Sequence, residues 1–317
     1  MNSRQLRYRV EYVVVLAVRA LVGVLPDRVG QAIGTFIGSA FYAADGAHRR
    51  LAIRQLRAAF PLRSEEECRT IARATFGHFG RLLVALLKFS TLDEAGLRAR
   101  VEYEGDERVR TALAGGKGVL LFSGHFGYWE LQGIAHPLAL PPMSVLARPL
   151  DNPYLHELLE KTRRATGNHV IYRRGAVRRI LRALQADECV ATMIDQHIQP
   201  VDAITVQFFN QPAATTSALA TLALRTGAPV IPVFALPLGG GRYRMIYEHP
   251  VELPAADSPD PVRELTQRCT DVLEMYVRRH PQLWLWMHRR WRLADADAAA
   301  AEPGMFPAAR EEEETES

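Results

Sequence analysis

The apolar positions of the chain follow two different patterns. Up to about residue 100 they recur at helical spacing, in two runs separated by a break at Pro26 and then in a longer segment. The pattern from Ser64 to Glu67 matches a capping box, and helical spacing continues from there to about Phe89. We therefore predict that residues 1–100 form a helical region that ends in a long core-facing helix.

From residue 101 to 293, short apolar runs alternate with helical patterns. The candidate strands are Gly118–Ser123, Met143–Ala147, His169–Tyr172, Cys189–Ile194, Ile204–Phe208, Val230–Ala235 and Tyr243–Glu248. This alternation predicts an α/β fold with a largely parallel central sheet flanked by helices, forming one domain with the preceding helices. The glycines at 239–241 predict a hairpin, and therefore a late antiparallel pair of strands.

The first two apolar runs, Tyr12–Val18 and Val29–Ala44, are too short to span a bilayer as helices. Arginines recur among them, at positions 4, 7, 9 and 19. Apolar helices with basic residues are typical of segments that lie in the membrane interface. We predict a membrane-associated, peripheral or monotopic N-terminal segment; the alternative is a helical hairpin that only covers the core.

Charge is unevenly distributed along the chain. The net charge is +4, but residues 311–317 hold five glutamates, so the chain without them is nearer +9 (4 + 5). We predict that residues 294–317 form a disordered acidic tail. The basic remainder suits an anionic partner, either nucleic acid or a phospholipid surface, although a coding bias toward arginine has the same effect. The three cysteines form no CxxC motif and are interpreted as core residues in a reducing compartment, with no metal-ligand spacing.

One strand–loop–helix stretch, residues 118–134, places a histidine and an acid where α/β sheets bind ligands. His125 directly follows the apolar strand, and Glu130 lies about one helical turn further. Chance also produces such spacing, and the chain holds a second pair, His197 with Asp202. Only the first pair follows a buried strand and opens a helix, so we take His125 and Glu130 as the candidate catalytic residues and the second pair as a coincidence.

Further polar residues follow the neighbouring predicted strands: Arg148, Arg173, Asp195 and Gln196. An imidazole beside a carboxylate suits general-base activation of a hydroxyl, and guanidinium groups suit phosphate or oxyanion binding. Ser123 is a poor candidate nucleophile because the GxSxG context is absent.

Six stretches occur together in one order and spacing: HFGYWE, ARPLDNP, IDQ, QFFNQPAATT, LALRTGAPVIPVFA and PQLWLWMHRRW. On these stretches the chain resembles, from about residue 8 to 292, the lipid A biosynthesis (lauroyl/myristoyl) acyltransferases and their relatives that acylate mannosylated phosphatidylinositol. The resemblance implies a lysophospholipid-acyltransferase-like fold and transfer of a fatty acyl group from a thioester to a glycolipid hydroxyl.

The resemblance also implies roles for individual residues. The HxxxxD/E motif of the family falls on His125 as general base and on Glu130, which is expected to orient the imidazole ring, with no acyl-enzyme intermediate. The residues expected to bind substrates are Arg148, Arg173, Asp195, Gln196, Phe126 and Tyr128, the last standing where the family usually has asparagine.

The expected co-substrate is acyl carrier protein or coenzyme A carrying the acyl chain, with no resident cofactor, no metal and no nucleic-acid partner. The expected location is the cytoplasmic face of the bacterial inner membrane. A thioester hydrolase and a non-catalytic membrane-binding or nucleic-acid-binding protein are the alternatives. The tryptophans at 284, 286 and 291 could stack on nucleic acid, but we favour packing of the C-terminal segment on the core.

Overall fold

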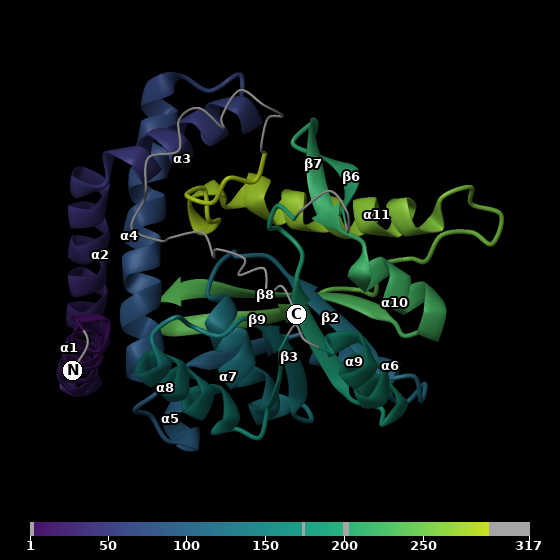
Figure 1. Cartoon of the computed structure of the whole chain (residues 1–317), viewed down its shortest axis with the longest axis horizontal. Coiled ribbons are helices and arrows are strands. Elements are labelled where there is room, and N and C mark those ends of the chain that lie inside the picture. Colours follow the sequence, from purple (N-terminus) through teal and green to yellow (C-terminus); the bar gives the residue numbers. More distant parts are fainter. Residues whose placement is uncertain (1–2, 173–174, 199–202, 292–317) are drawn as a thin grey trace, which may run out of the picture.

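A seven-stranded sheet lies at the centre of the computed structural model, which describes residues 3–172, 175–198 and 203–291 (Figure 1). The strand order is β1-β9-β8-β2-β5-β3-β4. The strands are β1 Val101–Glu104, β2 Val119–Ser123, β3 Met143–Ala147, β4 His169–Tyr172, β5 Cys189–Met193, β8 Val230–Gly239 and β9 Arg242–Tyr247. The five strands from β8 to β4 are parallel, while β9 pairs antiparallel with β8. The predicted largely parallel sheet with a late antiparallel pair is confirmed.

Helices cover both faces of this sheet. They are α1 Ser3–Val24, α2 Asp27–Ala44, α3 Gly46–Ala59, α4 Glu65–Phe89, α5 Glu94–Arg98, α6 Asp106–Leu113, α7 Trp129–Ala139, α8 Pro153–Arg164, α9 Ala176–Gln185, α10 Ala218–Thr226 and α11 Pro261–Arg279, followed by the 3₁₀ helix η2 Pro281–Leu283. Strand β2 is buried on both sides: Leu120 and Phe122 pack with α9, α10 and α11, whereas Val119 and Leu121 pack with α6 and α7.

The connections after β2 and β5 leave the sheet toward opposite faces. The chain passes from β2 to α7 on one face, and from β5 through a hairpin to α10 on the other. These two strands are parallel neighbours whose connections go to opposite faces, and the carboxyl ends of such strands are where open α/β sheets bind ligands. His125 follows β2 and Asp195 follows β5, so the strand order brings these two residues together.

Strand β6, Ala203–Phe208, lies outside the central sheet, contrary to the sequence-based prediction. It pairs antiparallel with β7, Gln211–Thr216, in a separate two-stranded sheet. The physical reason is its exposure: β6 alternates buried and exposed positions, whereas β2 is buried along its whole length. The sequence pattern also does not predict α3, β1 or β7. The predicted tail, residues 294–317, lies outside the described residues.

The long helix α4 begins as predicted and joins the N-terminal helices to the core. Its capping box is present: the Ser64 hydroxyl accepts from the Glu67 N–H (3.2 Å), and the Glu67 carboxylate accepts from the Ser64 N–H (2.7 Å). Phe76 packs on one side of the sheet and Leu82 on the other. The helix therefore closes one end of both core layers (Figure 1).

Helix α2 packs closely along α4 (Figure 1). A Cβ atom on Gly80 of α4 would lie 1.9 Å from the carbonyl oxygen of Gly34 on α2. A Cβ atom on Gly38 would lie 2.1 Å from the carbonyl oxygen of Phe76. Only glycine permits this approach.

Candidate active site

His125 and Asp195 form a hydrogen-bonded pair at the carboxyl ends of β2 and β5. The ring Nδ1 of His125 lies 2.8 Å from Asp195 Oδ1, and the His125 backbone N–H donates to Asp195 Oδ2 (2.7 Å). The indole N–H of Trp284 donates to the same Oδ2 (2.8 Å). Since the carboxylate accepts at Nδ1, the other ring nitrogen, Nε2, carries the lone pair and can act as a base.

The two pKa values of this pair move apart. Burial alone would lower the pKa of His125, but the charge and hydrogen bond of Asp195, and more weakly the charge of Glu130, raise it above 6.5. Burial alone would raise the pKa of Asp195, but attraction to His125 and the hydrogen bonds from His125 and Trp284 lower it to about 2. Asp195 is therefore an anion at every physiological pH, although it is only 4% exposed.

Glu130 does not hold the ring, which corrects the sequence-based prediction. Its carboxylate accepts two hydrogen bonds from Arg163 Nη2 (2.8 and 3.0 Å) and one from Arg163 Nε (3.2 Å). The reason is geometric: Glu130 lies in the first turn of α7 and meets the last turn of α8, where Arg163 is located. The site therefore contains the His125–Asp195 pair and a half-buried Glu130–Arg163 ion pair.

The loop that carries His125 is held by the C-terminal part of the chain. The Gly127 N–H donates to the Leu283 carbonyl (2.9 Å), and the Leu285 N–H donates to the His125 carbonyl (3.1 Å). Gly127 has φ = +60°, and a Cβ atom there would lie 2.2 Å from the Ala235 carbonyl oxygen. The loop conformation therefore requires glycine at this position.

His78 on α4 also supports the loop that carries His125. Its Nε2 lies 3.0 Å from the Gly127 carbonyl oxygen and donates to it. Burial lowers the pKa of His78 to about 4, and the Gly127 hydrogen bond opposes this shift only in part. The ring is therefore neutral at physiological pH and works as a fixed donor.

The chain is similar to known acyltransferases along most of its length. A family model described as "Bacterial lipid A biosynthesis acyltransferase" matches residues 1–293. The chain belongs to this family. The lipid A biosynthesis lauroyltransferase of Escherichia coli K12 is 26% identical over 86% of this chain and 88% of its own length. The phosphatidylinositol mannoside acyltransferase of Mycolicibacterium smegmatis is 22% identical, with the same coverage of both chains.

A solved structure was also matched, the 1-acyl-sn-glycerophosphate (LPA) acyltransferase PlsC from Thermotoga maritima. It is 14% identical, with a TM-score of 0.35, over 78% of this chain and 94% of that one. The two chains superimpose only loosely. The family and the curated relatives establish that this protein is an acyltransferase.

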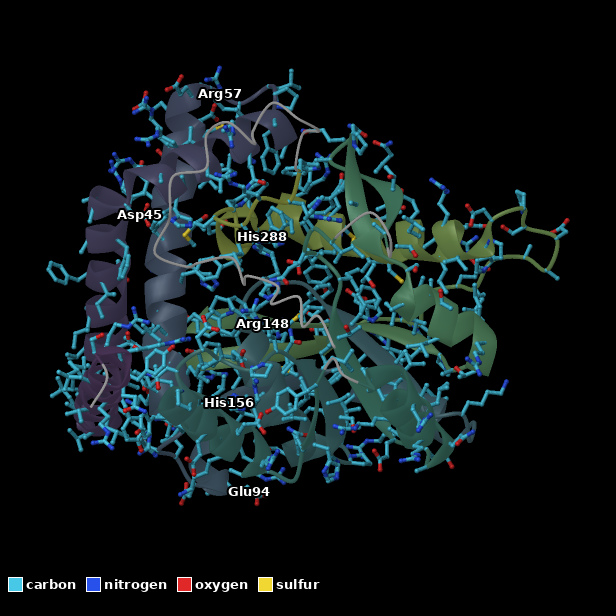
Figure 2. All side chains as sticks on the ribbon, viewed as in Figure 1. Asp45, Arg57, Glu94, Arg148, His156 and His288 are labelled. Atoms are coloured by element: carbon cyan, nitrogen blue, oxygen red, sulfur yellow. The ribbon has the colours of Figure 1, made fainter. Side chains whose placement is uncertain are left out.

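One further predicted site residue of this acyltransferase, Gln196, lies next to the His125–Asp195 pair. Gln196 Nε2 lies 3.4 Å from His125 Nε2, the ring nitrogen that does not face Asp195. Arg148 is 66% exposed on the loop after β3, 3.7 Å from the Asp151 carboxylate (Figure 2). Arg173 lies outside the described residues, as does Asp202 of the second His–acid pair.

Phe126 and Tyr128, which the sequence predicts as substrate contacts, are instead buried in the core. The Phe126 ring packs edge-on against Phe234 of β8 and Tyr276 of α11. Ser123 is also buried, and its hydroxyl accepts from the Gln132 side chain (3.0 Å). These three residues support the loop and the strand.

Arg163 and Trp284 are the site residues that sequence reasoning missed. Arg163 lies in a helix far from His125 in sequence, so no local spacing reveals it. Trp284 belongs to the motif PQLWLWMHRRW, where its packing role was predicted, but its hydrogen bond to Asp195 depends on the strand order. A buried tryptophan needs an acceptor for its N–H, and this requirement could have indicated that Trp284 bonds to a buried polar group.

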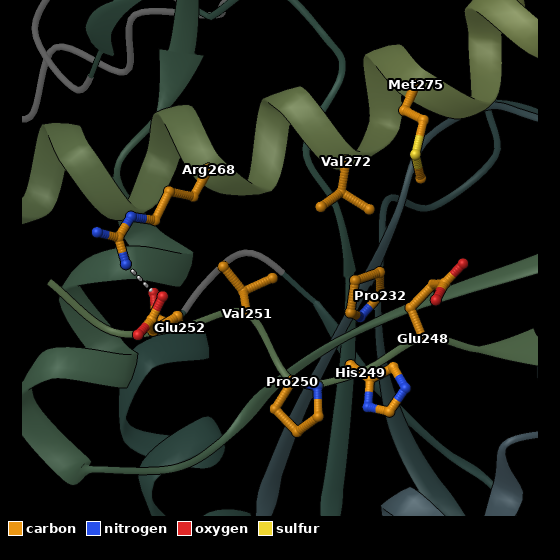
Figure 3. Close-up of a pocket in the computed structure, with 9 residues that line it drawn as sticks. All are labelled: Pro232, Glu248, His249, Pro250, Val251, Glu252, Arg268, Val272 and Met275. Atoms are coloured by element: carbon orange, nitrogen blue, oxygen red, sulfur yellow. Dashed lines mark hydrogen bonds between the residues drawn. The ribbon is translucent and has the colours of Figure 1, made fainter.

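A separate pocket of about 320 Å³ lies between α11 and the segment after β9 (Figure 3). Its lining residues are Pro232, Glu248, His249, Pro250, Val251, Glu252, Arg268, Val272 and Met275. Two charged groups there already have partners: Glu248 accepts from the Tyr276 hydroxyl (2.5 Å), and Arg268 donates to the Glu252 carbonyl (2.7 Å). The pocket contains none of the residues that surround His125.

Proposed function

We propose that this acyltransferase moves a fatty acyl chain from an acyl thioester, carried by acyl carrier protein or coenzyme A, to a hydroxyl of a glycolipid. The names of the curated relatives, which are lipid A and phosphatidylinositol mannoside enzymes, support this acceptor class. The observation that carries the mechanism is the hydrogen-bonded His125–Asp195 pair at the carboxyl ends of β2 and β5.

In this mechanism Nε2 of His125 removes the proton from the acceptor hydroxyl as its oxygen attacks the thioester carbonyl carbon. The new ester C–O bond forms, the C–S bond breaks, and the thiolate that leaves takes the proton back from the imidazolium. Asp195 holds the tautomer and stabilises the imidazolium while it exists. No acyl-enzyme intermediate is needed.

The other residues of the site act around this pair. Glu130 adds negative charge near the ring and holds Arg163, whose guanidinium can stabilise the negative charge of the tetrahedral intermediate. Gln196 is close enough to the ring to hold the acceptor hydroxyl in line with Nε2. Arg148, exposed at the rim, suits a phosphate group of a substrate.

The lipid profile of cells tests the reaction. Cells that make the parent protein are expected to contain a glycolipid heavier by one acyl chain, which is absent from cells making His125→Ala or neither protein. Mass spectrometry of the extracted lipids identifies the acceptor and the chain length together. Identical profiles in all three strains would overturn the transferase proposal for that host, and thiol release without an acceptor would indicate a thioester hydrolase.

The N-terminal helices are the proposed membrane contact. None of the described helices is long and apolar enough to cross a bilayer. Large apolar side chains nevertheless point outward from α1 and α2, among them Val24 (82% exposed) and Phe36 (74% exposed). Arginines lie in the first turns of α1. This combination supports peripheral binding to an anionic bilayer, at the cytoplasmic face of the bacterial inner membrane.

Vesicle binding tests this contact. The double variant Val24→Glu/Phe36→Glu is expected to bind phosphatidylglycerol vesicles about tenfold more weakly than the parent, because it places two carboxylates at an apolar, anionic surface. Co-sedimentation measures the bound fraction. The matched control is Val177→Glu/Leu238→Glu, which changes two exposed apolar residues on α9 and β8. Equal binding by all three proteins would move the contact away from α1 and α2.

A further inference from the structure

Arg290 is a fully buried cation behind the His125–Asp195 pair. Its side chain is 1% exposed, and it donates from Nη1 to the Ala214 carbonyl (2.6 Å) and to the Gln196 carbonyl (3.4 Å). Its Nη2 donates to the Thr215 hydroxyl. In the described part of the chain these partners are neutral oxygens, so no carboxylate neutralises the guanidinium by direct contact.

Asp195 is the acidic group whose charge acts on this cation. Burial lowers the pKa of Arg290 to about 10, and attraction to Asp195 opposes that shift. Asp195 is itself buried, and its own hydrogen-bond donors are His125 and Trp284. A buried anion and a buried cation that are not in contact still stabilise one another through the low dielectric of the interior.

Gln55, on a helix of the N-terminal region, fixes the backbone around Arg290. The Gln55 side chain on α3 accepts from the Arg290 backbone N–H (2.9 Å) and donates to the carbonyls of Trp286 (2.6 Å) and His288 (2.7 Å). The guanidinium also lies over the ring of Phe208, 5.6 Å from its centroid. An arginine this well held presents a fixed charge and a fixed set of donors.

We propose that Arg290 is a positioning residue for catalysis: its guanidinium holds the Asp195–Gln196 segment through the Gln196 carbonyl and supplies the buried positive charge that balances Asp195. The inference rests on the proposed role of His125 as general base. Arg290 acts through Asp195 and Gln196, and it touches neither the ring nor a substrate.

The charge of Arg290 is expected to reach His125 through Asp195. The charges that act on the ring directly are those of Asp195 and of Glu130, which is paired with Arg163, while the charge of Arg290 is attracted to Asp195. Removing one nearby positive charge favours the imidazolium, so the pKa of His125 rises. Because only the neutral ring accepts a proton, the acid limb of the profile of kcat/KM against pH moves to higher pH.

The test compares Arg290→Gln, which removes the charge but keeps a donor, with Arg290→Lys, which keeps the charge but loses the planar fork. Arg290→Gln is expected to raise both the acid limb and the NMR-measured ring pKa of His125 by about one unit. Arg290→Lys is expected to lower kcat with the acid limb unmoved. Arg289→Gln is the matched control, because the neighbouring arginine is exposed, and it is expected to behave as the parent.

An unshifted ring pKa of His125 in folded Arg290→Gln would overturn the proposal, whatever the loss of rate. Because the ring titration needs no turnover, it still tests Arg290 if the parent protein shows no acyl transfer, which would count against the proposed function alone. Should Arg290→Gln fail to fold, Thr215→Val removes one acceptor of the guanidinium. That variant is expected to lower kcat with KM unchanged, and a parental kcat would also overturn the proposal.

Discussion

Asp195→Asn is expected to lower kcat/KM by about 10³- to 10⁴-fold in a folded protein. The asparagine amide can donate to Nδ1 of His125, which would put the ring proton on Nε2 and remove the base. The neutral side chain also leaves the imidazolium without its counter-charge. Steady-state transfer of a radiolabelled acyl chain to extracted glycolipid measures the loss, and circular dichroism checks the fold.

Two further variants make this result specific. Asp187→Asn is the matched control: it makes the same chemical change at an exposed position just before β5, and asparagine tolerates its φ of +57°. Glu130→Gln is expected to lose only about 10- to 100-fold, since Glu130 is bonded to Arg163 and acts on the ring through space. A larger loss in Glu130→Gln than in Asp195→Asn would restore Glu130 as the partner of His125.

Gly80→Ala is expected to lower the free energy of unfolding by about 2–4 kcal/mol. The new methyl group would meet the backbone of α2, 1.9 Å from the Gly34 carbonyl oxygen, and backbone atoms cannot rotate away as a side chain can. The two helices must separate, and the apolar contacts along them are lost. Guanidinium denaturation followed by circular dichroism measures the change.

Gly77→Ala provides the control in the same helix. A methyl group at Gly77 would lie 3.4 Å from the end of the Arg81 side chain and 3.7 Å from Thr35, which are ordinary contacts. Because alanine favours a helix by up to about 1 kcal/mol over glycine, this variant is expected to be neutral or stabilising. Equal destabilisation by the two changes would mean that helix propensity, not the α2 contact, controls stability here.

The strands of the central sheet were the most predictable part of the fold. Strands β3 and β4 begin and end at the predicted residues, because short apolar runs between turn residues admit few other structures. Strand β7 has the sequence QPAATT, whose proline and small residues carry little strand signal, and its partner β6 supplies the pairing. The pairing partner of a strand is a tertiary property that a local pattern does not contain.

The same limit explains the partial prediction of the site. His125 and Asp195 were both predicted as polar residues at the ends of strands, but their pairing depends on β5 lying next to β2. Glu130 was the acid nearest to His125 in sequence and was therefore chosen for that role. Likewise, Gly77 and Gly80 look alike in the sequence, and only the position of α2 distinguishes them.

The hydrogen bonds between the His125 loop and residues 283–285 have a consequence for synthesis of the chain. The ribosome makes α1 and α2 before the central sheet, and His125 leaves it about half a chain length before Trp284 and Arg290. Until that last segment emerges, the Gly127 N–H lacks its acceptor and Asp195 lacks one of its donors. We therefore expect a nascent chain to have the helices of its proposed membrane contact while it is still inactive, with activity beginning only after the C-terminal segment is released.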